Sequence, residues 1–369
     1  MRLIVLDENF EAVGAIAIFN TLIWDRRYYE PGVFELYAPV DTFPLLNTGK
    51  YICRNDRDEL AVIRNPCYKQ NNAGERSAYA KGYFVESLIG NRVINSTQNL
   101  TGTPEDIMRS LVNTFVINPS DGNRKMPIVR LGTRKGFGTS VRVQTTGANL
   151  SDKLYEIGQT QEMSHRLVYD YENNILTFEV WQGLDRTDSQ EVNSWAIFSN
   201  SFYNVKDVIY ERNDSEYKNY AYVAGEGEGA ARVVVEIDIR SSTTEERREL
   251  YVDARDLQSS YYDSNNVEHH YTAAQYREML RQRGLEKLSE YNMIEIVNSN
   301  IDPGANLVYE TDFDLGDLCT YQNTELGITC TKRITQIQEV YEGVKTSLVL
   351  TFGTDDASTI TKIIRRETG

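Results

Sequence analysis

The sequence predicts a mainly β protein with an α+β insertion, and three observations lead to that prediction. Short segments with apolar residues at every second position fill residues 1–97 and return after residue 201. Residues 98–200 instead contain segments whose apolar residues share one helical face. The chain has 24 Tyr against 12 Phe, and Tyr suits the half-buried surface of a sheet. At 369 residues the chain is too long for one ordinary core, so we expect two or three domains.

Residues 1–97 contain a series of short strands separated by Asn, Asp and Gly, which indicates a barrel or a sandwich. The most distinctive stretch is residues 24–36, which predicts a strand, a polar corner and a return strand. Pro31 and Gly32 supply the corner. After it, Phe34 and Leu36 alternate with other residues, as in a sheet with two unlike faces. We therefore predict an N-terminal β-barrel over residues 1–97.

Residues 98–200 are predicted to form a separate, peripheral α+β domain. Thr103 can cap a helix, and Pro104 fits its first position. A second helix is predicted to begin at Ser151. Two strand-like segments on either side of residues 172–174 then predict a β-hairpin.

Residues 201–369 are predicted to form a second β-barrel with a helical insert around residues 241–290. The glycine-rich residues 225–229 precede a Val-rich strand rather than a helix, so we expect a hairpin loop and no dinucleotide site. Thr272 and Gln275 fit a capping box at the start of a helix. Strands then continue to about residue 353. Residues 355–369 are expected to add a short strand or to fray.

The composition narrows the classes of function. The net charge of −15 repels phosphate and argues against tight binding of nucleic acid. The four cysteines are widely spaced, which indicates free thiols in a reducing compartment. The first residues meet a charge too early for a secretory signal, and no apolar run of about 18 residues predicts a membrane span.

The sequence offers few ingredients for catalysis, and we predict no catalytic, cofactor-binding or metal-binding residues. His165 stands alone, and the adjacent His269 and His270 cannot face one ligand. The basic, glycine-rich residues 132–138 lack the ending of a P-loop and predict a mobile loop. A Cys–His pair brought together by the fold stays open. So does a pair of carboxylates, because 54 acidic residues allow no choice from sequence.

Two polar corners supply the candidate structural or interface residues. The acids near residue 314 lack the further oxygens of a calcium loop, so we expect a turn whose Asp side chains accept hydrogen bonds from local N–H groups. The other corner is rich in Arg and Tyr, which dominate binding energy where they lie at a subunit contact. The candidate residues are Trp24, Arg26, Arg27, Tyr28, Tyr29, Asp312, Asp314 and Asp317.

Residues 24–36 resemble the N-terminal barrel of siphophage tail-tip hub proteins. Those proteins are related in fold to the central hub of contractile baseplates and to the N-terminal part of tail-associated lysins. Similar motifs lie at residues 220–240, 249–257, 283–288 and 312–353, so the resemblance covers nearly the whole chain. Residues 100–200 match poorly, which leaves their role open. The motifs are structural corners and include no catalytic residue. The resemblance implies two tail-tube-like β-barrels, one from each end region.

The same resemblance implies a homotrimer whose six barrels surround a channel. Distal tail and tail-tube proteins would dock above it, and a spike, fibre or receptor-binding protein below. DNA would pass without binding, because three copies carry three times the −15 of one chain. The implied location is the virion tail, assembled in the host cytoplasm, with no cofactor. The chain stops at Gly369, without the further domain that carries the hydrolase in lysins, so no enzyme activity is expected.

Two alternatives stay open from the sequence. The β-rich pattern and the many aromatic residues also fit a cell-wall or polysaccharide hydrolase, which turnover of peptidoglycan or host glycans would reveal. They fit a carbohydrate-binding adhesin as well, which binding to a glycan array would reveal.

Overall fold

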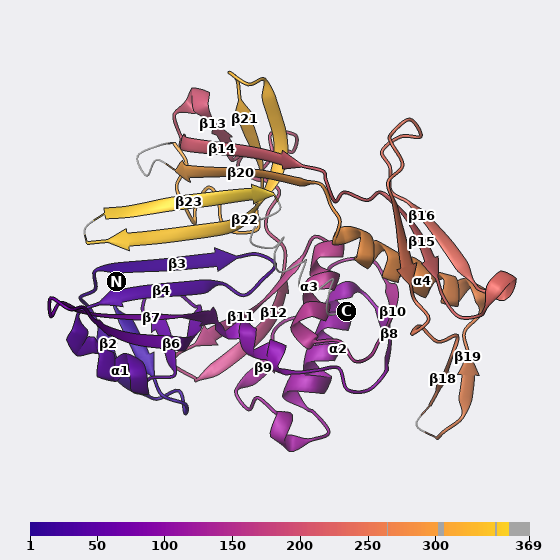
Figure 1. Cartoon of the computed structure of the whole chain (residues 1–369), viewed down its shortest axis with the longest axis horizontal. Coiled ribbons are helices and arrows are strands. Elements are labelled where there is room, and N and C mark those ends of the chain that lie inside the picture. Colours follow the sequence, from indigo (N-terminus) through magenta and orange to yellow (C-terminus); the bar gives the residue numbers. More distant parts are fainter. Residues whose placement is uncertain (264, 302–305, 344, 354–369) are drawn as a thin grey trace.

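The strands of both end regions lie in one large sheet (Figure 1). The computed structural model describes residues 1–263, 265–301, 306–343 and 345–353. Within these residues, the thirteen-stranded sheet has the order β14-β20-β23-β22-β3-β4-β7-β6-β5-β1-β2, and β21 and β13 continue it from β22. The prediction of a mainly β fold with a few helices is confirmed. The expectation for residues 355–369 lies outside the described residues.

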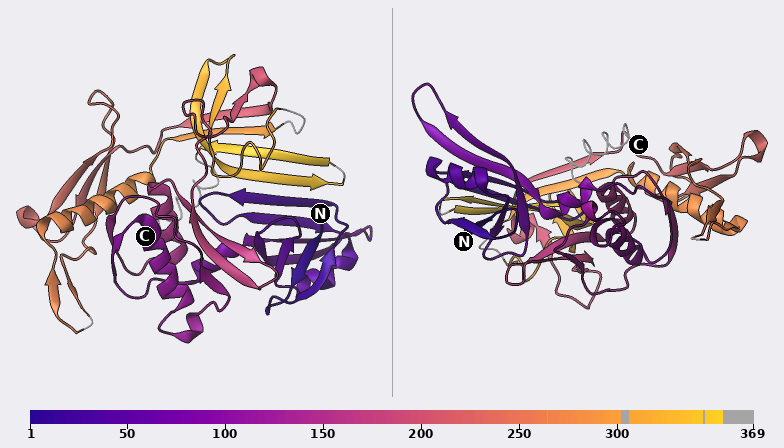
Figure 2. Two further views of the ribbon diagram at one scale, coloured as in Figure 1. Left: turned by 180° about the vertical axis from the view of Figure 1, so that it is seen from behind. Right: turned by 90° about the horizontal axis from the view of Figure 1, so that it is seen from below.

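The N-terminal region supplies seven strands and one short helix, α1 (Phe43–Thr48). The hairpin of β6 and β7 projects from the body of the molecule (Figure 2). Alternate residues of β4 are buried, because one face of this strand covers the core and the other does not. The strands are β1 (Leu3–Leu6), β2 (Ala12–Ile16), β3 (Thr21–Arg27), β4 (Val33–Ala38), β5 (Tyr51–Arg54), β6 (Leu60–Gln70) and β7 (Arg76–Phe84).

The C-terminal region pairs directly with the N-terminal region. Strands β22 and β3 run antiparallel, from Gln336 opposite Arg27 to Glu342 opposite Thr21. Through this pair, segments about three hundred residues apart in sequence become neighbours. The strands of the C-terminal region are β13 (Ile197–Ser199), β14 (Val205–Asn213), β20 (Ile294–Ile301), β21 (Leu318–Asn323), β22 (Ile328–Glu342) and β23 (Lys345–Gly353).

The α+β region contains the predicted helix from Pro104, and Thr103 Oγ1 accepts a hydrogen bond from the Asp106 N–H as expected. The second helix begins at Leu150, one residue earlier than predicted, because Asn149 caps it. The predicted hairpin is confirmed. The elements are β8 (Gln98–Gly102), α2 (Pro104–Val112), a π-helical turn (Asn113–Ile117), β9 (Val129–Leu131), β10 (Val141–Thr145), α3 (Leu150–Thr160), β11 (Ser164–Asp170) and β12 (Ile175–Trp181).

An insert between β14 and β20 forms its own small sheet, with the order β16-β15-β17. The predicted hairpin around residues 225–229 joins β15 to β16, and the capping box of Thr272 and Gln275 starts α4. Tyr276 and Leu280 of α4 pack against this sheet. The elements are β15 (Tyr220–Ala224), β16 (Val234–Asp238), β17 (Glu249–Asp253), β18 (Ser260–Tyr262), β19 (Glu268–His270) and α4 (Ala273–Ser289).

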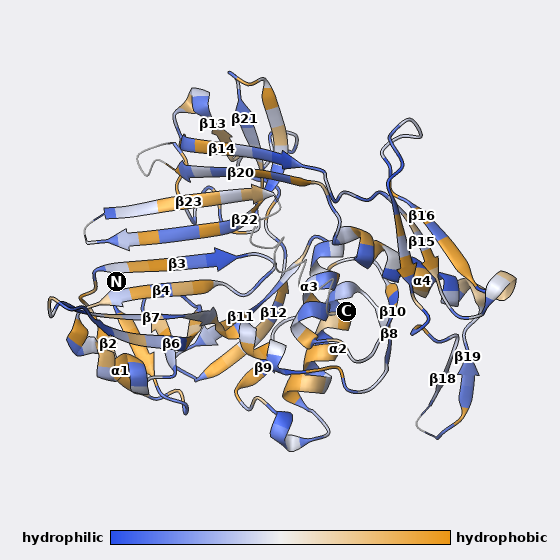
Figure 3. Cartoon of the chain, viewed as in Figure 1, coloured by the Kyte–Doolittle hydropathy of each residue, from blue (hydrophilic) through white to orange (hydrophobic). Residues whose placement is uncertain are grey.

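Apolar residues gather where these parts meet. Hydropathy colouring shows the apolar side of α2 and the polar arm of β18 and β19 (Figure 3). One core cluster joins Tyr51 and Val62 of the first region to Leu111 and Leu154 of the α+β region. The domain boundaries at residues 97 and 200 stay predictions. No helix among the described residues is long and apolar enough to cross a membrane.

Candidate functional site at the junction of the end regions

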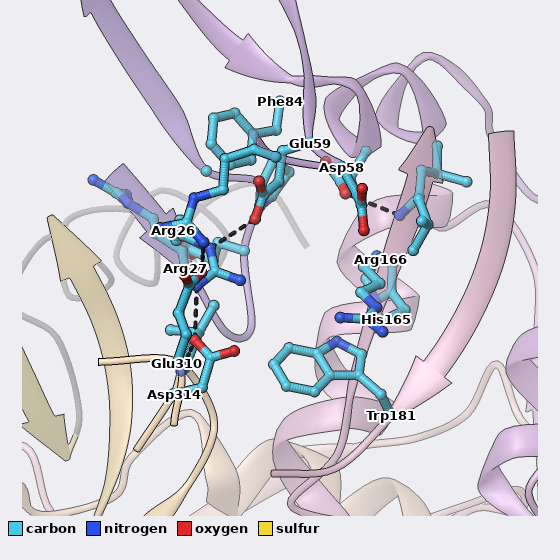
Figure 4. Close-up of a pocket in the computed structure, with 18 of the residues that line it drawn as sticks. Arg26, Arg27, Asp58, Glu59, Phe84, His165, Arg166, Trp181, Glu310 and Asp314 are labelled. Carbon is cyan, nitrogen blue, oxygen red and sulfur yellow. Dashed lines mark hydrogen bonds and ion pairs between the residues drawn. The ribbon is translucent and has the colours of Figure 1, made fainter. Parts of the chain in front are cut away.

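Arg26 at the end of β3 brings the two polar corners together (Figure 4). Its Nη1 donates to Asp314 Oδ1 at 2.7 Å and to the Tyr309 hydroxyl at 2.7 Å, while its Nε donates to Glu59 Oε1 at 2.6 Å. Arg26 is buried. The two stretches that are most distinctive in the sequence are therefore the two sides of one junction, which charge-assisted hydrogen bonds hold together.

A second group of charges lies beside the first, around Glu339 on β22. Its carboxylate accepts from Arg54 Nη1 and Arg57 Nη2, both at 2.6 Å, and from the Tyr309 hydroxyl at 3.0 Å. The side chains of Arg54 and Glu339 are each only 2% exposed. Burial alone would raise the pKa of Glu339, but the charges of Arg54 and Arg57 outweigh burial and lower it. Arg54 and Glu339 therefore stay ionised inside the protein.

Aromatic rings pack next to the charged groups. The buried ring of Tyr28 meets Trp181 edge-on, with 4.9 Å between the ring centroids. Gly316, in the second polar corner, lies against the Tyr28 ring and has a φ of +84°. A Cβ at this position would overlap the Tyr28 ring. A glycine is therefore required at this corner for conformation and for space.

The three acids of the second corner accept hydrogen bonds from nearby backbone, as predicted. Asp312 Oδ2 accepts from the Val308 N–H at 2.8 Å, and Asp314 Oδ1 from the Leu315 N–H at 2.7 Å. Asp317 Oδ2 accepts from the Asp314 N–H at 3.0 Å. No group of three or more metal-binding side chains occurs in the described part of the chain. These acids therefore shape the corner.

The remaining candidates also lie inside the subunit or close to its core. Trp24 is fully buried, 4.7 Å from the ring of Phe84. Arg27 pairs with Asp25 at 3.0 Å, and Tyr29 packs edge-on against Tyr28. A role for the eight candidates at a subunit contact stays a prediction.

Sequence reasoning missed the partners of these candidates, above all Glu339. One signal was present, since Ile337 and Glu339 occupy the same face of β22 and both are buried. A charge on the apolar face of a strand indicates a buried ion pair. The sequence carried no comparable signal for Arg57, which follows the turn after β5, or for Glu59, which immediately precedes β6. Several other charged residues surround both.

A cavity of about 300 Å³ opens beside the junction, between β3, the turn after β5 and the hairpin of β11 and β12. Burial raises the pKa of Glu86 in its wall to about 7, and Glu86 Oε1 accepts from the Leu167 N–H at 2.9 Å. Burial lowers the pKa of His165 to about 4, so its imidazole is neutral at pH 7. Glu59 in the same wall is paired with Arg26 at 2.6 Å.

Other motifs have structural roles. The loop at residues 132–138 was expected to be mobile, but the Glu105 carboxylate accepts hydrogen bonds from the N–H groups of Lys135, Gly136 and Phe137. These three N–H groups are therefore already bound to a carboxylate of the protein itself. His269 pairs with Asp263 at 3.0 Å, whereas His270 lies near Glu268, so the two histidines have separate partners. The four cysteines are free.

A model of the Siphovirus ReqiPepy6 Gp37-like protein family matches residues 2–354. The chain belongs to this family. A search of curated proteins gives no match.

Several solved tail proteins have a similar fold. This Gp37-like chain is similar to the 43 kDa tail protein of prophage MuSo2 from Shewanella oneidensis, with 11% identity over 97% of this chain and 99% of that chain, at a TM-score of 0.57. It is also similar to the prophage tail protein gp18 from Listeria monocytogenes EGD-e, with 10% identity over all of both chains, at a TM-score of 0.56. A tail protein from Neisseria meningitidis MC58 gives 10% identity over 96% of both chains, at a TM-score of 0.55. The Gp37-like chain thus has the fold of phage tail proteins along its whole length.

Proposed function

We propose that this Gp37-like protein is a non-enzymatic hub of a phage tail tip, in a virion or a prophage-derived particle. Three copies would form a ring that joins a sixfold tail tube to a threefold tip and lets DNA pass. The observation that supports this proposal most is the β22–β3 pair, which places the two end regions side by side in one sheet. Two such β units in each of three chains supply the six positions that a sixfold tube needs.

The sheet offers edges through which copies could join. Among the residues that the structure describes, the outer part of β6 pairs only with β7, because β5 ends its pairing with β6 at Val62. Within the same residues, strand β14 pairs only with β20. An open edge exposes a row of N–H and C=O groups that can pair with another chain. Copies that join head to tail through such an edge would close a ring.

The charge fits the passage of DNA. One chain carries −15, so the walls of a trimeric ring repel phosphate rather than bind it. The proposed partners are distal tail and tail-tube proteins on one side and a spike, fibre or receptor-binding protein on the other. The proposed location is the virion tail, after assembly in the host cytoplasm.

Native mass spectrometry of the purified chain tests the trimer. We expect a species of three times the 42.3 kDa of one chain, and a strictly monomeric species at every concentration would overturn the proposal. The variant Ile209→Lys adds a charge on β14, where Ile209 is exposed, and should weaken the trimer without unfolding the subunit.

The absence of enzyme activity is tested separately. Purified protein incubated with peptidoglycan and with host glycans should release no soluble products. Clear turnover would favour the hydrolase alternative instead. Binding to a glycan array without trimer formation would favour the adhesin alternative.

A further inference from the structure

The cavity beside the junction of the end regions is lined by polar atoms that have no partner among the described residues. We propose that this cavity binds one uncharged sugar ring, as a free sugar or as a residue of a glycan chain. The inference concerns a single chain, so it goes beyond the proposed hub function and does not rest on the trimer.

Four buried polar atoms belong to side chains in the wall of the cavity and have no hydrogen-bond partner in the described part of the chain. They are Arg57 Nε, Glu59 Oε2, Glu86 Oε2 and Trp181 Nε1. The other oxygen of each carboxylate is already used, since Glu59 Oε1 accepts from Arg26 Nε and Glu86 Oε1 accepts from the Leu167 N–H. A buried polar atom without a partner is costly, so four of them around one cavity indicate a bound molecule.

Glu86 is the most deeply buried of these groups, with 7% of the residue exposed. Burial above all, and to a smaller degree the charge of Glu59, raises the pKa of Glu86 to about 7. The effect of Glu59 means that the two carboxylates lie near each other in the wall. Near pH 7, Glu86 Oε2 can therefore either donate or accept a hydrogen bond.

The balance of donors, acceptors and charge selects the class of ligand. Seven acids and four arginines line the cavity, so an anion such as a phosphate or a carboxylate is repelled. An amine only donates, and it would leave the N–H groups of Arg57 and Trp181 without an acceptor. A hydroxyl group both donates and accepts, so a molecule with several hydroxyl groups can satisfy all four atoms.

The apolar part of the wall favours a sugar ring over a cluster of water molecules. Figure 4 shows Phe84 and Trp181 on two sides of the cavity. A sugar ring carries hydroxyl groups around its edge and C–H groups on its faces, and such faces pack against aromatic and aliphatic side chains. The volume of about 300 Å³ lies at the lower end of the range of about 300–1,000 Å³ for ligand pockets, which favours a single ring.

Saturation-transfer NMR with the full chain tests the proposal. The probes are glucose, galactose, mannose and N-acetylglucosamine, each also as its methyl glycoside, and glucuronate is the charged comparison. We expect at least one neutral sugar to bind in the millimolar range, more tightly than glucuronate. Binding of the methyl glycoside would assign the cavity to a residue of a glycan chain, and binding of the free sugar alone to a monosaccharide. No transfer to any neutral sugar, or tighter binding of glucuronate, would overturn the proposal.

A pair of tryptophan variants locates the binding site. Trp181→Phe removes one of the four atoms but keeps an aromatic ring, and the dissociation constant from calorimetry should rise about tenfold with the loss of one hydrogen bond. The matched control Trp195→Phe changes a tryptophan that is 53% exposed and does not line the cavity, and it should bind sugar like the wild type. Sugar should also change the tryptophan fluorescence of the control but not that of Trp181→Phe. Equal affinities of the two variants would contradict binding in this cavity.

Glu86→Gln is a second variant, and circular dichroism shows whether each variant folds. Its amide oxygen can still accept from the Leu167 N–H, but its amide nitrogen cannot accept from the ligand, so binding should weaken severalfold. Unchanged affinity in this folded variant would also count against the site. Native mass spectrometry tests the hub separately. A trimer that binds no sugar would refute only the sugar site, whereas a monomer that binds sugar would refute only the hub.

Discussion

At the scale of single residues, the junction depends on charges that burial makes costly to leave alone. Arg54 and Glu339 have lost nearly all contact with water, and each needs the other. The free energy of unfolding should therefore respond strongly when one partner is neutralised. An exposed ion pair of the same type, such as Arg166 with Glu179, should contribute little.

Glu339→Gln is expected to lower the free energy of unfolding by about 3–5 kcal/mol, because it leaves Arg54 and Arg57 without their common carboxylate. Urea denaturation followed by circular dichroism measures the loss. The control Glu179→Gln, whose partner Arg166 is 45% exposed, should change stability by less than about 1 kcal/mol. Equal effects of the two substitutions would contradict a buried network at the junction.

The pH dependence of stability should reveal Glu86. Its pKa is about 7 in the folded chain and about 4.3 when unfolded, so between these values the folded chain holds the extra proton and stability falls as pH rises. The pKa of His165, about 4 when folded and about 6.5 when unfolded, gives the opposite trend between about pH 4 and 6.5. The two trends partly cancel in the wild type.

Glu86→Gln removes the fall in stability with rising pH that Glu86 causes. The variant keeps an acceptor for the Leu167 N–H. From about pH 5 to 8 the variant should gain roughly 2–3 kcal/mol of stability relative to the wild type, at about 1.4 kcal/mol per pH unit. Urea denaturation at several pH values measures the difference. Parallel pH profiles of the two proteins would show that Glu86 keeps an ordinary pKa.

At the scale of elements, the sequence predicted correctly those helices and hairpins that depend only on residues near them in the chain. Thr103 and the capping box of Thr272 start their helices, and the hairpin around residues 172–174 forms, because each depends on neighbours in sequence. The loop at residues 132–138 differs, since its partner Glu105 lies about thirty residues away on α2. A loop that appears mobile from its glycines is held by a contact that only the fold creates.

The corner at Gly316 gives a test at this scale. Gly316→Ala is expected to cost about 2–4 kcal/mol, because the methyl group overlaps Tyr28 in addition to the strain of a positive φ. Gly327→Ala is the matched control, with a φ of +65° and open space around its Cβ, and it should cost only about 1–2 kcal/mol. Thermal and urea unfolding measure both variants. Similar losses would mean that the Tyr28 ring moves aside.

At the scale of the whole molecule, neither end region is complete without other parts of the chain. The edge of β3 is covered by β22, and the cluster around Val62 and Leu111 combines residues from both sides of position 97. The boundaries at residues 97 and 200 stay predictions, and the regions on either side of residue 97 share this cluster. We expect the full chain to unfold as one cooperative unit.

A fragment of residues 1–97 should accordingly stay poorly folded or aggregate, because it exposes the edge of β3 and the apolar residues that face α2. Co-expression with residues 98–369 should restore a soluble complex. Circular dichroism and analytical ultracentrifugation compare the fragment, the complex and the full chain. Cooperative unfolding of the isolated fragment would establish residues 1–97 as an independent domain.

The sequence by itself determined the mainly β class, the capped helices, the hairpins and the two corners at residues 24–36 and 312–318, because each has a local pattern of apolar spacing or turn residues. The tertiary structure decided that these corners meet through Arg26 and Asp314, that Glu339 is buried between two arginines, and that β2 ends the sheet. The reason is physical. Local patterns fix how a few neighbouring residues fold, whereas the pairing of strands three hundred residues apart depends on packing and charge that no short segment contains.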